Sequence, residues 1–137
     1  MKLFRNALYI ILIVLTIFLA LTAIPGGVVL LANFYTPPMD MLAGSMFKDF
    51  TIPGLSLALI VGGSALFAAI LLFRKSKFDI IFSATAGIII MFFEFVEILA
   101  IGSPAGPARF MQILYFGLGT AIVVASMGTW FLDLRSD

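Results

Sequence analysis

The chain has 137 residues and a formal net charge of +1; 63% of its residues are hydrophobic and 11% are charged. A soluble domain needs more charge to cover its surface, so this composition and a mean hydropathy of +1.22 indicate one integral membrane domain over residues 1–137. Cysteine and histidine are both absent, which excludes disulfides, thiolate chemistry and imidazole bases or ligands. We therefore expect no metal, no cofactor, no enzyme activity and no nucleic-acid partner.

The first predicted helix covers residues 7–31 and follows a basic start that contains Lys2 and Arg5. The run is long enough to cross a hydrocarbon core of about 30 Å. A basic start before an apolar run is also typical of a secretory signal, but this run is longer and has no small-residue cleavage site before Pro25. We expect a retained helix that kinks or loses its regular part at Pro25, because proline removes a backbone donor.

The longest connection, residues 33–52, contains Pro37-Pro38 and amphipathically spaced Met and Phe residues, which predict a short helix at the membrane interface. The second predicted helix covers residues 53–73 and begins at Pro53, where a missing N–H costs little. Its small residues recur at steps of four, three and four, a spacing that favours close contact between helices in lipid. These residues are Ala58, Gly62, Ala65 and Ala69.

The third predicted helix, residues 78–101, contains two acids, Glu94 and Glu97, in an otherwise apolar stretch. Three residues turn a helix by about 300°, so both acids lie on one face, about 4.5 Å apart along the axis. A carboxylate near the bilayer centre costs about 2.5–3.5 kcal/mol, so this face is expected to point into protein. The face continues toward the start of the helix with Ser83, Gly87 and Ile90.

The fourth predicted helix covers residues 108–132, with Trp130 as an interfacial anchor. It has two stripes, of which we expect the one made of small residues to be the packing surface. The small stripe is Gly117, Ala121, Ala125 and Gly128, and the adjoining polar stripe is Gln112, Tyr115, Gly119, Ser126 and Thr129.

Loop charges predict the orientation of these four helices. Six of the eight Lys and Arg residues lie on the side of the two chain ends, and only Lys48 and Arg109 lie on the other. The positive-inside rule then places both the N- and C-termini in the cytoplasm and the long first loop outside. The predicted fold is an all-α bundle of four transmembrane helices.

Counting residues from the helix ends places the polar side chains of the third and fourth helices at similar depth, in the outer third of the bundle. We interpret this cluster as an outward-facing site for a small ligand, a lipid head group, or a cation or proton, with transport as one use of it. The alternative is a structural or accessory subunit in which Glu97 pairs with Arg109 and Glu94 bonds to Tyr115 or Gln112. The candidate site residues are Glu94, Glu97, Arg109, Gln112, Tyr115, Asn33 and Asp49.

The segment Phe47-Lys48-Asp49-Phe50-Thr51-Ile52-Pro53-Gly54, followed by an apolar helix with Gly62-Gly63 and a helix with Glu97, resembles a group of small four-helix bacterial membrane proteins of no assigned function. The similarity in layout covers about residues 33–130. It implies a multi-pass protein of the bacterial cytoplasmic (inner) membrane and brings no activity with it. The expected partners are membrane lipids and either a second copy of the chain or another membrane protein.

Overall fold

The computed structural model describes residues 2–31, 51–103 and 105–136, and within these ranges it contains helices and no strand. Four of its helical segments are long and apolar enough to cross a membrane, which confirms the predicted all-α class. The predicted interfacial helix of the first loop lies outside the described residues. The elements are α1 (Lys2–Leu31), α2 (Thr51–Leu55), the π-helix η2 (Ser56–Val61), α3 (Gly62–Phe73), α4 (Asp79–Ile101) and α5 (Pro107–Ser136).

Helix α1 runs through Pro25 without ending there, so the expected loss of regular helix at this residue is wrong. Close packing explains why the helix continues. A Cβ built on Gly27 would lie 2.5 Å from the Gly54 carbonyl oxygen and 2.6 Å from the Ala58 Cβ, so α1 is in backbone contact with α2 and η2 just beyond the proline. Pro25 itself is on the exposed side of α1, away from this contact.

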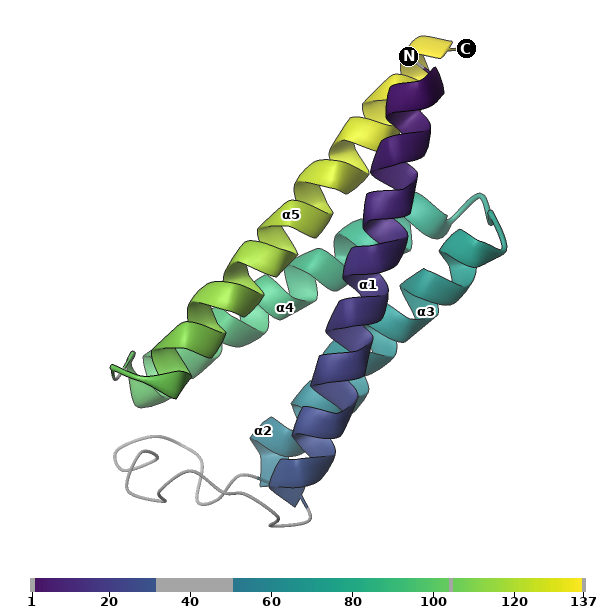
Figure 1. Cartoon of the computed structure of the whole chain (residues 1–137). Helices are drawn as coiled ribbons and strands as arrows, with labels where there is room; N and C mark the ends of the chain where they lie inside the picture. Colours follow the sequence, from purple (N-terminus) through teal and green to yellow (C-terminus); the bar gives the residue numbers. More distant parts are fainter. Residues whose placement is uncertain (1, 32–50, 104, 137) are drawn as a thin grey trace.

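The four spans form a closed ring in which each packs on two neighbours (Figure 1). Helix α1 contacts α3 and α5, and α4 contacts α3 and α5, whereas α1 and α4 are diagonal and touch little. Both chain ends lie at one end of the bundle, and the turn between α4 and α5 lies at the other (Figure 1). We call these the terminal end and the far end.

The bundle has its large apolar side chains outside and small or hydroxyl side chains inside. Leu99, Leu21 and Phe92 are 72%, 68% and 66% exposed, whereas Ser83 and Thr129 are fully buried. An apolar surface of this extent suits lipid and not water. Hydroxyls such as that of Thr129 donate to the carbonyl four residues earlier, here Ala125 at 2.8 Å, which satisfies them without water.

Two glycines set the register between α4 and α5. A Cβ built on Gly87 would lie 2.9 Å from the Gly119 carbonyl oxygen, and one built on Gly119 would lie 2.8 Å from the Gly87 carbonyl oxygen. The two backbones therefore cross in direct contact at these residues.

The small residues predicted as the packing stripe of the second helix are all buried, which confirms that prediction. In α5 the prediction is wrong for Gly117 and Ala121, which are exposed, and confirmed for Ala125, which is buried; Gly128 is partly buried. The far-end half of the α5 interior is made by the polar stripe, whose burial keeps these polar groups out of the hydrocarbon. All five members of that stripe are buried: Gln112, Tyr115, Gly119, Ser126 and Thr129.

Candidate functional site

The two acids of α4 both face the protein, as their spacing predicts. Glu94 is 1% exposed and Glu97 is half-buried. Their carboxyl groups are close enough to interact with each other directly. Burial of a carboxyl group in an apolar bundle is costly unless donors or cations surround it, so the neighbours of Glu94 decide what the site can do.

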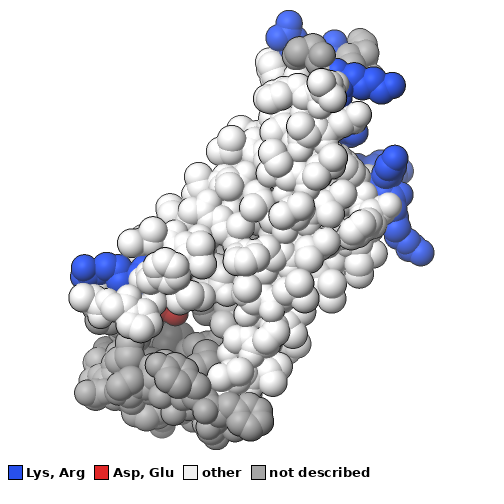
Figure 2. Space-filling model, in the orientation of Figure 1, with Lys and Arg blue, Asp and Glu red and all other residues white. Residues whose placement is uncertain are grey.

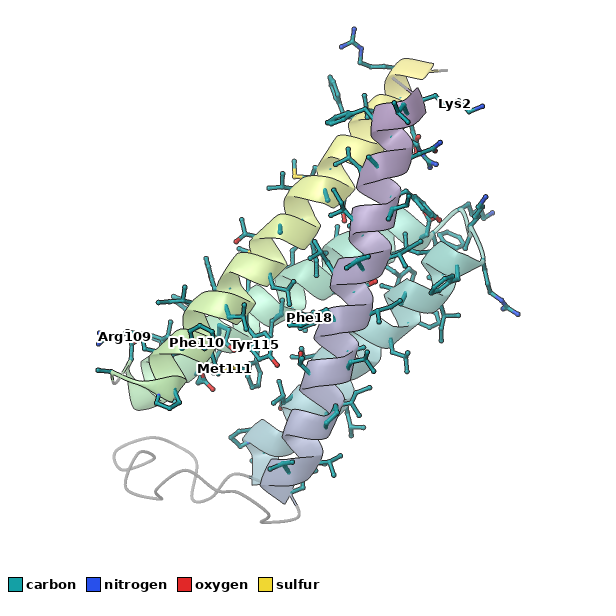
Figure 3. The ribbon with its side chains drawn as sticks, in the orientation of Figure 1. Lys2, Phe18, Arg109, Phe110, Met111 and Tyr115 are labelled. Atoms are coloured by element: carbon teal, nitrogen blue, oxygen red, sulfur yellow. The ribbon has the colours of Figure 1, made fainter. Side chains whose placement is uncertain are left out.

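Helix α5 and helix α1 supply those neighbours. Seven residues from each crossing glycine toward the far end are Glu94 on α4 and Gln112 on α5, so both lie in the same stretch of the packed α4–α5 pair. Tyr115 lies one turn further along α5, is 5% exposed, and interacts with Thr22 of α1 and with the charges of Glu94 and Glu97. Figure 3 shows Tyr115 on the part of α5 that faces α1. Thr22 is a member of the cluster that the sequence did not indicate.

Two buried acceptor oxygens in this cluster have no hydrogen-bond partner in the described part of the chain: Glu94 Oε2 and Gln112 Oε1. The Gln112 amide is held in place because its Nε2 donates to the Gly102 carbonyl at 2.9 Å. Turning the amide over would place two oxygens against each other, so Oε1 must face the other way. The site thus presents acceptors that lack donors.

Arg109 lies near this cluster in the sequence but binds elsewhere in the structure. Its Nε and Nη2 donate to the Ser103 carbonyl at 3.1 and 2.6 Å, and its side chain is exposed at the tip of α5 (Figure 3). Within the described ranges no ion pair joins it to Glu97. The structure therefore brings together Glu94, Glu97 and Tyr115. Gln112 is buried on the same face of α5, with its amide bonded to Gly102 at the end of α4. Arg109 lies outside the cluster, and Asn33 and Asp49 lie outside the described residues.

Glu97 is the member of the cluster that reaches the surface. Its side chain is partly exposed, whereas Glu94, Gln112 and Tyr115 are 1%, 2% and 5% exposed. Figure 2 shows acidic surface, in red, at the far end of the molecule.

A second polar cluster, at the terminal end, was not predicted. The Tyr9 hydroxyl interacts with the Leu72 carbonyl at 2.7 Å and donates a short hydrogen bond to Asp79, which is 7% exposed. Arg5 forms a two-pronged ion pair with Asp133, at 2.9 and 3.3 Å, and stacks on the Tyr9 ring. One signal could have revealed Asp79: it is four residues before Ser83, so it extends the face of α4 that carries the two glutamates.

Two cavities adjoin this terminal cluster, one of about 340 Å³ and one of about 420 Å³. Arg5, Tyr9 and Lys75 line both, so the two cavities adjoin one another at these residues. In the described part of the chain no group of three or more acidic residues is placed to hold a metal ion.

Comparison of the sequence with protein-family models, with curated proteins and with solved structures gave no match. The class of the protein is therefore defined by its architecture: an all-helical chain with four helices long and apolar enough to span a membrane.

Proposed function

We propose that this chain is a small integral membrane protein whose far-end cluster binds a cation: a proton, an alkali ion or an alkylammonium group. The observation that carries the proposal is the pair of buried acceptors, Glu94 Oε2 and Gln112 Oε1, that lack donors. An anionic ligand would add further acceptors beside these oxygens, and a neutral ligand could donate to them but would not compensate a carboxylate charge. A cation supplies what both lack, and it also compensates the buried carboxylate.

The neighbouring groups support a cation as well. Glu97 adds a second carboxyl group beside the first, and Tyr115 adds an oxygen from α5. Alkali ions prefer oxygen ligands, and an ammonium group donates up to three hydrogen bonds to such oxygens. Among the described residues no basic side chain forms an ion pair with either acid, so their charge is not already neutralised from within the protein.

The orientation of the site is part of the proposal. Most basic residues, in blue in Figure 2, lie toward the end of the bundle that carries both chain ends in Figure 1. They favour the cytoplasm for that end and an outward-facing site at the far end. Four helices enclose little space, so movement of a cation through the protein would require a second copy of the chain or a partner subunit.

The test measures the thermal unfolding midpoint of the purified protein in detergent, at several pH values, with sodium, potassium or methylammonium chloride. Choline chloride is the control for ionic strength, because its quaternary nitrogen has no N–H and therefore cannot donate a hydrogen bond to these oxygens, as methylammonium can. A ligand that binds only the folded state raises the midpoint with concentration. We expect one of the cations, or lowered pH, to stabilise the wild type, and Glu94→Gln to abolish this effect. Asp133→Asn makes the same acid-to-amide change at the terminal end and should retain the response.

A second candidate is a structural or accessory subunit in which the acids only hold helices together. The fully packed small-residue interior, with backbone contact at Gly87 and Gly119, favours it. In that case neither cations nor pH would shift the midpoint of the wild type by more than choline does, and Glu94→Gln would change stability equally under all conditions. That result would contradict the cation site.

A further inference from the structure

The terminal end carries a cavity of about 340 Å³ that the proposed cation site does not use. It lies between the start of α1, the turn joining α3 to α4, and the end of α5. Its lining combines basic side chains with apolar ones, and the residues that matter to the argument are Arg5, Lys75, Lys77, Asp79, Ile81 and Trp130.

The turn that carries the two lysines is a defined structure. Lys75 has a φ of 52°, and its N–H donates to the Leu72 carbonyl at 3.1 Å. The Ser76 N–H donates to the Leu71 carbonyl at 3.0 Å, and the Ser76 carbonyl accepts the Asp79 N–H at 3.1 Å. These bonds hold the backbone of both lysines at the edge of the cavity while leaving their ammonium groups exposed.

Some of the charged groups that line the cavity have a partner within the protein, and others are exposed to a ligand. Arg5 is held by Asp133, and Asp79 accepts the hydroxyl of Tyr9. The ammonium groups of Lys75 and Lys77 form no ion pair within the described residues; Lys77 lies over the Phe78 ring, 5.1 Å from its centre. Two exposed cations therefore remain available for a ligand, which must be anionic.

The apolar part of the lining indicates that the ligand also has an apolar part. Ile81 and Trp130 are 61% and 56% exposed, and they extend from the cavity along the outer surface of α4 and α5. The second cavity, which also adjoins Lys75, is lined by Ile10 and Phe73, which are equally exposed. A ligand that fits both features has an anionic head beside apolar chains, which is the chemistry of an acidic phospholipid at a membrane interface.

We propose that the terminal-end cavity is a binding site for an anionic phospholipid, with the lipid phosphate between Lys75 and Lys77 and its acyl chains against Ile81 and Trp130. The site is independent of the acids at the far end. Because two ammonium groups contact the lipid charge, the preference over a zwitterionic lipid should be about thirtyfold in affinity. It should weaken as salt concentration rises.

The experiment uses the full-length protein in detergent, titrated with phosphatidylglycerol or phosphatidylcholine, and counts bound lipid by native mass spectrometry. The test variant is Lys75→Gln/Lys77→Gln. The matched control is Lys2→Gln/Arg74→Gln, which removes the same charge from two exposed residues of the same end that line neither cavity. Unfolding in lipid-free detergent checks that both variants fold, since all four side chains are on the surface.

We expect the test variant to bind the two lipids within about twofold of each other and the control to keep most of the wild-type preference. Equal loss in both variants would overturn the proposal, because it would mean that general positive charge attracts the lipid. Competition by free inorganic phosphate or glycerol 3-phosphate at the lipid's own concentration would overturn it too, since the acyl chains would then contribute nothing.

Discussion

Replacing Gly119 by alanine tests the crossing of α4 and α5 most directly. The added Cβ would lie 2.8 Å from the Gly87 carbonyl oxygen and 2.7 Å from Ile90 Cγ2 and Met91 Cγ. Ordinary contacts of this kind are about 3.4 Å or longer, so the helices must separate by several tenths of an ångström. Met91 can rotate away, but a backbone carbonyl cannot move without its helix. We expect a loss of about 1–3 kcal/mol in the free energy of unfolding, measured by titration with a denaturing detergent.

Gly117→Ala is the matched control, because it makes the same change on the same helix at an exposed residue with no atom within 4 Å of the new Cβ. Its free energy of unfolding should stay the same or rise, since alanine favours helix more than glycine does. If the Gly119 and Gly117 variants unfold at the same detergent concentration, the two backbones do not meet at this crossing. The register that places Glu94 and Gln112 in the same stretch of the α4–α5 pair would then fail with it.

Two further changes separate the buried and the exposed parts of the terminal cluster. Tyr9→Phe removes a hydroxyl that bonds to Asp79 and sits 2.7 Å from the Leu72 carbonyl, so it should cost about 1–3 kcal/mol in the same titration because a buried acid loses its donor. Arg5→Gln removes an ion pair whose side chains are 35% and 42% exposed and should cost less than about 1 kcal/mol. An equal or larger loss for the arginine variant would contradict this ranking.

The sequence was sufficient to predict the four spans, because each is a long, predominantly apolar run between charged or proline-containing segments. The small stripe of η2 and α3 was predictable too, since the Ser64 hydroxyl donates to the Val61 carbonyl of the same span and needs no place in the interior. In α5 the Gly117 and Ala121 half of the small stripe was wrongly assigned to the interior. Gly117 is small enough to pack closely, but its burial adds little favourable free energy because it has no side chain. An amide such as that of Gln112 would lack hydrogen-bond partners if it faced hydrocarbon, which costs free energy. In α5 the polar stripe is therefore buried along its whole length, and the small stripe only in part.

The candidate site was predictable in part for a related reason. Glu94 and Glu97 stand out because they interrupt an apolar helix, and the count from the helix ends placed Gln112 and Tyr115 near them. Counting residues could not decide the partner of Arg109. Its side chain is long enough to reach either Glu97 or the Ser103 carbonyl of the adjoining turn, and in the structure it binds Ser103. No periodicity in α1 marked Thr22, whose position depends on how α1 rotates against α5.

The two buried acids of α4 show why the far end, and not the terminal end, is the better candidate for a cation. Asp79 and Glu94 lie on one continuous buried face of the helix, so burial alone does not distinguish them. Their donors do. Asp79 receives the Tyr9 hydroxyl, whereas Glu94 keeps one buried oxygen without a partner. An acid that the protein already satisfies has a structural role without any ligand, but an acid left unsatisfied in an apolar bundle requires a proton or a cation for the folded state to be stable.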